Sequence, residues 1–226
     1  MKILVVAPHA DDETLGMGGA IARYAREGHD VTVAVLTGHG DEVPHPLWPK
    51  KIWDTVRAEL REACAILGVT DIILEEIPAV MVSEQPVWKL NQVTGRIVQT
   101  VEPDILYVPF LNDLHKDHRE CFHSFSVAWR PFTRSGRSIK EVFAYEVSSE
   151  THLNFPYVEQ GFLPNTWVDI SDYLEIKLKA LACYKSQTRP HPSARSLKAV
   201  EALAVWRGSQ VGVAAAEAFV LVRKIA

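Results

Sequence analysis

The sequence has no run of eighteen apolar residues, which excludes a membrane-spanning helix of ordinary length. It also has no excess of basic residues: 24 Lys and Arg stand against 28 Asp and Glu, a formal net charge of −4. A basic surface for nucleic acid or for an anionic membrane is therefore not indicated. We expect neither nucleic acid nor a membrane among the partners of this protein.

Cysteine is scarce as well. Cys64, Cys121 and Cys183 are odd in number and far apart, and they form no C-x-x-C pair, so no disulfide framework is indicated. Such usage fits a reducing compartment. The chain enters an apolar run directly after Met1 and Lys2, without the charged and long apolar segments of a signal peptide. These features predict a cytoplasmic protein.

The 226 residues, 47% hydrophobic and 23% charged, suit one globular domain over 1–226. In the first half, short apolar runs alternate with helical patterns, as in a parallel sheet covered on both faces. The expected strands are 2–7, 31–36, 72–74 and 105–110, and the expected helices are 14–27, 52–67, 87–101 and 121–129. The segment 37–50 between them, rich in Gly, Pro and His, is expected to be a loop.

The second half is less regular. It predicts strands at 141–147, 167–170 and 218–223, helices at 171–184 and 193–206, and a polar loop at 148–165. The fold class is therefore α/β: a Rossmann-like, mostly parallel sheet flanked by helices, with an irregular C-terminal half that completes the site.

A polar hexapeptide, Pro8-His9-Ala10-Asp11-Asp12-Glu13, closes the first expected strand. Desolvated carboxylates this close repel one another unless a positive charge lies between them. His9 and Asp12 are spaced to reach one divalent ion, whereas Asp11 would project sideways and accept a proton from water at the ion. A catalytic zinc usually has three protein ligands and an open position, so a third ligand should lie elsewhere.

A second cluster, Asn112-Asp113-Leu114-His115-Lys116-Asp117-His118, follows the strand expected at 105–110. If the two strands are parallel neighbours, both clusters lie at one crevice. The alternative is that these acids only cap helices and the histidines are solvated. Because both clusters occupy matching topological positions, a metal site is the preferred interpretation.

The helix after the hexapeptide begins with Gly16-Met17-Gly18-Gly19, which invites comparison with a dinucleotide-binding loop. Ile21 occupies the third glycine position of that fingerprint, and three acids at the helix start would repel a pyrophosphate. The glycines are better explained by close packing of the helix on the sheet.

Together the two clusters resemble the motifs of the PIG-L/LmbE family of zinc-dependent N-deacetylases, P-H-P-D-D-E and H-x-D-H. Here they stand as Pro8–Glu13, with Ala10 in place of the proline, and as His115–His118. Segments 57–68, 177–187 and 207–219 are also similar, so the likeness covers nearly the whole chain. It implies removal of the acetyl group from an N-acetylglucosamine-type sugar or its conjugate, with Zn²⁺ (or Fe²⁺) as cofactor, in a homo-oligomer.

The resemblance also implies roles for individual residues. His9, Asp12 and His118 would bind the metal, Asp11 would be the general base, and His115 would stabilise charge or act as an acid. Glu13 would orient a loop or a ligand.

On the substrate side the resemblance implies Arg57. Asp113 lies two positions before His115, where some relatives have a tyrosine that polarises the carbonyl, so a second oxyanion donor is unassigned. His191 is one candidate for it, and a residue of the loop 151–165 is another.

Other functions fit parts of the pattern. A metal-dependent amidase could cleave a larger acyl or thiol–sugar conjugate with the same centre. A non-catalytic sugar-binding protein would lack Asp11 or a metal ligand, and neither is missing. A two-metal phosphate esterase would bind two ions per chain.

Overall fold

In residues 1–40, 44–134 and 136–226, which the computed structural model describes, seven strands form one sheet of order β3-β2-β1-β4-β5-β7-β6. The strands are β1 (Lys2–Ala7), β2 (Asp30–Gly38), β3 (Asp71–Pro78), β4 (Ile105–Pro109), β5 (Glu141–Tyr145), β6 (Thr166–Asp169) and β7 (Ala216–Lys224). The α-helices are α1 (Asp12–Arg26), α2 (Lys50–Leu67), α3 (Val87–Val101), α4 (Lys116–Ala128), α5 (Leu174–Leu181) and α6 (Leu197–Ser209), with 3₁₀ turns η1 (Val82–Glu84) and η2 (Thr151–Leu153).

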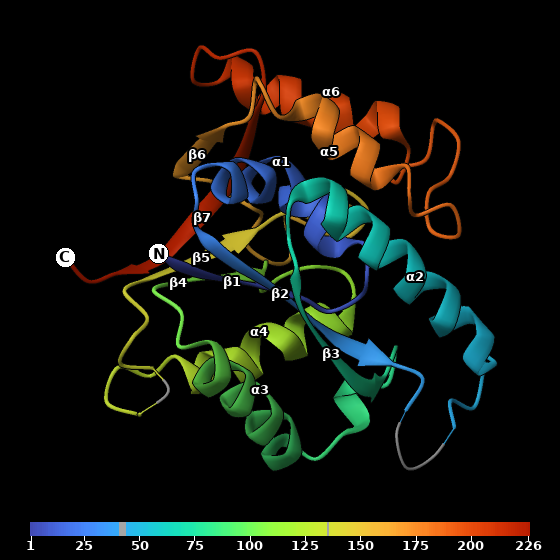
Figure 1. Ribbon diagram of the computed structural model, residues 1–226, viewed down its shortest axis with the longest axis vertical. Coiled ribbons are helices and arrows are strands. Elements are labelled where there is room, and N and C mark those ends of the chain that lie inside the picture. The colour runs from blue at the N-terminus through green and yellow to red at the C-terminus, as the bar shows by residue number, and fades with distance from the viewer. Residues whose placement is uncertain (41–43, 135) are drawn as a thin grey trace.

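The sheet is mostly parallel, as predicted. Strands β3, β2, β1, β4 and β5 run parallel, whereas β7 pairs antiparallel with both β5 and β6. Helices cover both faces: α1, α2, α5 and α6 lie on one side of the sheet and α3 and α4 on the other (Figure 1). The expectation of an α/β fold with its parallel part in the first half is confirmed.

Strand β1 is apolar from Ile3 to Ala7, and its place inside the sheet shows why. Ile3 and Val5 pack into the core shared with α1, α2 and α5, and Leu4 and Val6 into the core beneath α3 and α4. All four side chains are fully buried. A strand covered on both faces needs apolar residues at every position.

Two glycines of α1 permit the close packing that the sequence indicates. A Cβ atom on Gly16 would lie 2.3 Å from the Tyr145 ring, and one on Gly19 would lie 2.7 Å from the Ile170 side chain. Larger residues at these two positions would push α1 away from Tyr145 and Ile170. The polar turn at the amino end of α1 would move with the helix.

Helix α1 is kinked at Met17, where φ is −149°. The kink frees backbone donors, which Glu217 of β7 satisfies: its carboxylate accepts hydrogen bonds from the amides of Gly19 (2.9 Å) and Ala20 (2.6 Å). Lys177 of α5 donates to the same carboxylate at 2.5 Å. This buried group therefore ties α1, α5 and β7 together.

Some helix boundaries differ from those expected. Helix α4 begins at Lys116 instead of residue 121, because the Nδ1 atom of His115 accepts the amide hydrogen of Asp117 and caps it. Helix α6 begins at Leu197, where the Ser196 hydroxyl accepts from the Ala199 amide. The earlier start of α4 fixes His118 on the first turn of a helix.

The loop expected over 37–50 is shorter in the structure, because β2 continues to Gly38 and α2 begins at Lys50; residues 41–43 of it lie outside the described residues. Among the helices that the structure describes, none combines the length and apolar character needed to cross a bilayer.

Candidate metal centre and active site

The two polar clusters meet because their strands are neighbours. β1 pairs parallel with β4, with Ile3 opposite Ile105 and Val5 opposite Tyr107. Their carboxyl ends therefore open at the same edge of the sheet, where the turn Pro8–Asp11 and the loop before α4 lie side by side. The predicted convergence on one crevice is confirmed.

Three of the converging side chains form a ligand set for a metal ion. The Oδ2 atom of Asp12 lies 3.3 Å from Nδ1 of His9 and 3.2 Å from Nε2 of His118. A donor atom from each residue lies within 4.8 Å of the other two. His118 Nε2 is buried and has no hydrogen-bond partner among the described residues. An unpartnered imidazole nitrogen facing a buried carboxylate is what a divalent cation would satisfy.

Both histidine rings are oriented by a second carboxylate. His118 Nδ1 lies 2.8 Å from Asp113, and His9 Nε2 lies 3.0 Å from Asp117. Each ring thus directs its other nitrogen toward Asp12. This carboxylate–histidine arrangement is usual around protein-bound metals, where it fixes the ring and its tautomer.

The electrostatics favour positive charge at this point. Burial lowers the pKa of His9, but hydrogen bonds with Asp117 and Asp12 outweigh it and raise the pKa to about 9. Burial likewise opposes charge on His118, yet Asp12 and Asp113 hold its pKa well above the ordinary value. The acids would stabilise a bound cation in the same way.

A second set of potential ligands, His9, His115 and Asp117, shares His9 with the first. Its atoms are already engaged: Asp117 accepts the amides of Val80 (2.6 Å) and Val82 (3.3 Å) and pairs with His9. His115 Nδ1 accepts the Asp117 amide at 3.1 Å. The set His9, Asp12 and His118 is therefore the better metal site.

Asp11 lies beside the ligands in a strained position. Its φ is 128°, a region that residues other than glycine rarely adopt. Asp11 occupies the N-cap position of α1, and its carbonyl oxygen accepts the amide of Leu15 at 2.8 Å, but its side chain makes no cap hydrogen bond. Oδ2 accepts from Arg195 at 2.6 Å, while Oδ1 is buried without a partner within the part of the chain that the structure describes. One carboxylate oxygen is therefore fixed and the other is available.

Burial dominates the titration of Asp11. It raises the pKa to about 8, with Arg195 opposing the shift and Asp12 and Glu13 adding to it. A carboxyl group that titrates near neutrality can both accept and return a proton at working pH.

The resemblance implies that His115 stabilises charge or acts as an acid, and its pKa bears on that choice. Burial and the neighbouring His9 lower its pKa to about 4. Because Nδ1 accepts the Asp117 amide, the proton of the neutral ring lies on Nε2. His115 is thus a neutral hydrogen-bond donor.

Glu13 is buried behind the site. Its Oε2 atom accepts from the Asp11 amide at 3.1 Å, and Oε1 accepts from the hydroxyls of Thr14 and Tyr184. These contacts hold the strained turn rather than reach toward a substrate.

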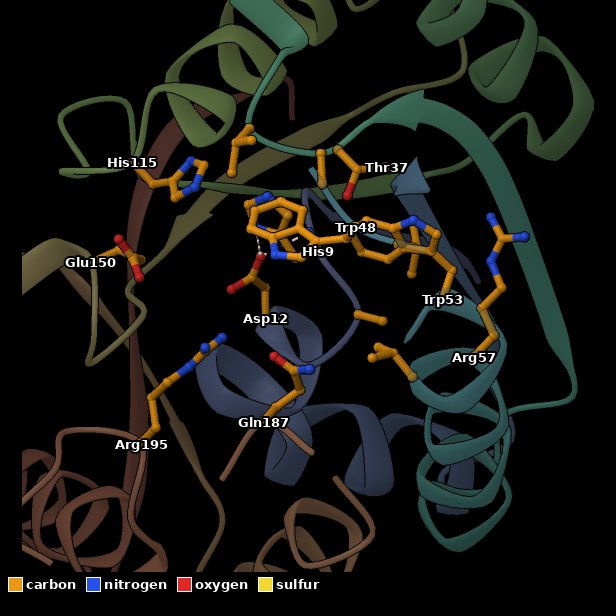
Figure 2. A pocket seen from close by; sticks show the side chains of 15 residues that line it. His9, Asp12, Thr37, Trp48, Trp53, Arg57, His115, Glu150, Gln187 and Arg195 are labelled. Atoms are coloured by element: carbon orange, nitrogen blue, oxygen red, sulfur yellow. Dashed lines mark hydrogen bonds and ion pairs between the residues drawn. The ribbon is translucent and has the colours of Figure 1, made fainter. Parts of the chain in front are cut away.

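The pocket at the site has a volume of about 330 Å³, at the small end of ligand cavities. Figure 2 shows His9 and Asp12 near its centre, with Trp53 and Arg57 on one side and Glu150 and Arg195 on the other. The lining side chains that carry charge or hydrogen-bonding groups are His9, Asp12, Thr37, Trp48, Trp53, Arg57, His115, Glu150, Gln187 and Arg195.

Of the three residues expected to contact the substrate, Arg57, Asp113 and His191, only Arg57 lines the pocket. Arg57 lines the pocket, where it pairs with Glu76 and donates to the Glu75 carbonyl at 3.1 Å. Asp113 does not line it: the side chain is fully buried behind His118, and its second oxygen accepts from Thr151 at 2.6 Å. The substrate role expected for Asp113 is thus replaced by a role behind a metal ligand.

His191 also lies away from the pocket, exposed in the segment before α6. The same segment does contribute to the site, but through Arg195. Arg195, Glu150 and Gln187 also line the pocket and have no role predicted from the sequence. Nothing in the local sequence of Arg195 or Glu150 distinguishes them from solvated residues of a loop, and the similarity of segment 177–187 to the family gives Gln187 no role.

Comparison with known proteins identifies the family. Residues 4–129 match the family described as GlcNAc-PI de-N-acetylase, PIG-L. The chain is 30% identical over 228 residues to the 1D-myo-inositol 2-acetamido-2-deoxy-alpha-D-glucopyranoside deacetylase of Actinosynnema mirum, covering 82% of this chain and 80% of that protein. It is 28% identical over 203 residues to the diacetylchitobiose deacetylase of Thermococcus kodakarensis, covering 82% and 70%.

Among solved structures, the 4-carboxy-2-hydroxymuconate hydratase GalB of Pseudomonas putida KT2440 superposes with a TM-score of 0.77 at 22% identity, over 100% of this chain and 98% of that one. That likeness shows the fold alone. One fold can carry different reactions, so the chemistry must be argued from the site.

The chain belongs to the GlcNAc-PI de-N-acetylase family. This membership confirms the family predicted from the two motifs, and with it an enzyme that acts on N-acetyl amide bonds.

Proposed function

We propose that the protein is a zinc-dependent hydrolase that removes the acetyl group from an N-acetylglucosamine-type amino sugar or its conjugate. The observation that carries the proposal is the juxtaposition of the ligand set His9, Asp12 and His118 with the available Oδ1 atom of Asp11. Hydrolysis of an amide needs both an activated water and a base placed to take its proton.

His9, Asp12 and His118 would hold the ion through two nitrogens and one oxygen. Zinc accepts this donor set in hydrolases, and iron(II) binds similar sets, so zinc is our first choice and iron(II) the second. When bound, the ion supplies Lewis acidity and makes the attacking water more acidic.

The remaining steps belong to the chain. Asp11 Oδ1 accepts the proton of the attacking water, while Arg195 keeps the other oxygen of the carboxylate in place. The Nε2–H group of His115 donates to the carbonyl oxygen as negative charge develops there. Asp11 then returns its proton to the leaving amine, a task that its pKa of about 8 permits and that the low pKa of His115 argues against.

The substrate class rests on the relatives and on the pocket. The two curated relatives are named for deacetylation of an acetamido-sugar conjugate of inositol and of diacetylchitobiose. A cavity of about 330 Å³ accommodates a small molecule of this kind. A cytoplasmic location and a homo-oligomeric state stay predictions.

The test is acetate release by the zinc-loaded protein from a panel of N-acetylated amino sugars and conjugates, followed by mass spectrometry for the loss of one acetyl group. The panel should include longer N-acyl groups and thiol–sugar conjugates, which separate a deacetylase from a broader amidase. Asp11→Asn is the matched control: it should retain zinc, and its turnover number should be about 10²–10⁴-fold lower than that of the wild type. If the Asp11→Asn variant releases acetate as fast as the wild type does, Asp11 is not the general base.

A further inference from the structure

Two tryptophan rings form one wall of the pocket, and nothing in the hydrolytic steps requires them. Trp48 and Trp53 both line the cavity, with ring centroids 6.2 Å apart and planes at 85°, so that they form a corner. His45 lies behind them, 4.8 Å from Trp48 in a stacked arrangement and 5.6 Å from Trp53. We call Trp48 and Trp53 the aromatic corner.

The aromatic corner is held rigidly by His45. This ring is only 5% exposed, and both of its nitrogens are engaged. Nε2 donates to the carbonyl of Ala79 at 2.9 Å, and Nδ1 accepts the amide of Leu47 at 3.1 Å. A buried imidazole fixed in one tautomer therefore supports Trp48 against the segment that follows β3.

Two features of the corner point to a ligand. Trp48 is 38% exposed at the rim of the cavity, and among the described residues only His45 is stacked on its ring. The Nε1–H group of Trp53 is buried and has no hydrogen-bond partner among the described residues. A buried indole N–H normally finds an acceptor, so an oxygen atom of a bound molecule would complete it.

The charges around the pocket limit what that molecule can be. Both arginines that line the cavity are already paired, Arg57 with Glu76 and Arg195 with Asp11. Glu150, across the pocket, forms no ion pair within the described part of the chain and adds negative charge. Among the described side chains that line the cavity, no unpaired Lys or Arg is left for an anionic group.

We propose that the aromatic corner binds the group attached to the N-acetylated sugar, and that this group is uncharged, with a flat apolar face for Trp48 and an acceptor oxygen for Trp53. The inference rests on the proposed function for the position of the acetyl group at the metal centre. The chemistry is shared by an aromatic aglycone and by the C–H face of a second pyranose ring, and both stack on tryptophan.

The experiment compares kcat/KM of zinc-loaded protein on the methyl, phenyl and 4-carboxyphenyl β-glycosides of N-acetylglucosamine and on N,N′-diacetylchitobiose. Wild type should prefer the phenyl glycoside or the disaccharide to the methyl glycoside about tenfold, through KM, because the contact is remote from the scissile bond. A preference for the phenyl glycoside would indicate an aromatic aglycone, and a preference for the disaccharide would indicate a second pyranose ring. The 4-carboxyphenyl glycoside should be used less well than the phenyl glycoside.

Trp48→Ala should abolish this preference. Trp48→Phe should keep most of the preference, because it retains an aromatic ring. Trp53→Phe removes the N–H donor while keeping a smaller aromatic ring, and it should reduce the preference. Trp88→Ala is the control, because Trp88 is 69% exposed on α3 and does not line the pocket. A preference that survives in both Trp48→Ala and Trp53→Phe, or its absence in wild type, would overturn the proposal.

Failure of the proposed function would appear differently, as no acetate release from any glycoside. In that case the corner is still tested by calorimetric binding of phenyl and methyl β-glucosaminide to the zinc-loaded protein. Phenyl-selective binding that Trp48→Ala weakens about tenfold would support the corner, and equal binding of the two compounds would refute it.

Discussion

Asp113 holds His118 from behind: its carboxylate oxygen lies 2.8 Å from Nδ1 of the imidazole, and both side chains are fully buried. Asp117 has the same relation to His9 at 3.0 Å. The two imidazoles therefore reach Asp12 in fixed orientations, and the site is organised before a metal ion arrives. Preorganisation of this kind raises metal affinity because little ordering remains to be done on binding.

Removal of this support should weaken metal binding. We expect Asp113→Ala to lower zinc affinity about 10- to 100-fold, and Asp113→Asn to lower it less, since its amide oxygen still accepts from His118. Competition with a chromophoric chelator measures the effect. Asp172→Asn, an exposed aspartate at the start of the segment leading to α5, is the control. Unchanged affinity in Asp113→Ala would mean that His118 is not a ligand.

Substitution of His115 distinguishes between the two possible sets of metal ligands. We expect His115→Ala to lower kcat by about 10²–10³ through loss of an oxyanion donor, with zinc affinity unchanged. The reason is that its Nδ1 atom already accepts the Asp117 amide, so His115 lies outside the preferred set. The measurement pairs steady-state kinetics with the chelator competition. A large loss of affinity would instead favour the set His9, His115 and Asp117.

The strands and the convergence of the two motifs could be predicted because they depend on local sequence. Strand β1 is apolar from Ile3 to Ala7, and each polar cluster follows soon after an apolar strand. Parallel neighbours then place both clusters at one edge of the sheet. The sequence predicts a later start for α4 than the structure has, because the cap is an imidazole, His115, rather than one of the usual cap residues.

The rest of the site depends on contacts that span most of the chain. Arg195 reaches Asp11 across 184 positions, from a segment in which His191 was the more conspicuous candidate. The resemblance places Asp113 at the substrate, but the turn before α4 directs its side chain inward to His118 and Thr151. Sequence spacing identifies residue types near a motif and does not indicate which way such side chains point.

Arg195 should set the pH range of catalysis. Its guanidinium opposes the burial that raises the pKa of Asp11, so Arg195→Ala should raise that pKa further. The base must be unprotonated, and activity on the acidic side should therefore fall, with the rising limb of kcat/KM moving to higher pH. Arg195→Lys should restore part of the shift because it keeps the charge. Equal pH profiles for wild type and Arg195→Ala would contradict this coupling.

Metal binding should release protons. In the metal-free protein the pKa of His9 is raised to about 9 and that of His118 lies well above its ordinary value. A ligand nitrogen must be unprotonated, so zinc should displace about two protons near pH 7.5 and bind more tightly as pH rises toward 9. Calorimetry in buffers of different ionisation enthalpy counts these protons, and identical heats in all buffers would contradict the prediction.

The same histidines make the stability of the metal-free protein depend on pH. A folded-state pKa above the unfolded value of 6.5 stabilises the fold below pH 6.5, and this contribution is lost as pH rises through about 9. The melting temperature of chelator-treated protein should therefore fall by several degrees over this range. Zinc-loaded protein should fall less, because its histidines are already unprotonated.

The buried pair of Lys177 and Glu217 should be a determinant of stability through the kink of α1. Lys177→Met leaves the Glu217 carboxylate buried with only the amides of Gly19 and Ala20, and we expect it to cost about 3–5 kcal/mol. In the double variant Lys177→Met/Glu217→Gln, neither side chain carries a charge, and the glutamine oxygen can still accept a backbone amide. The double variant should therefore be more stable than Lys177→Met alone. Denaturant unfolding of zinc-loaded protein measures both, with exposed Lys179→Met as the control. Strict additivity of the two substitutions would show that the ion pair does not couple α5 to β7.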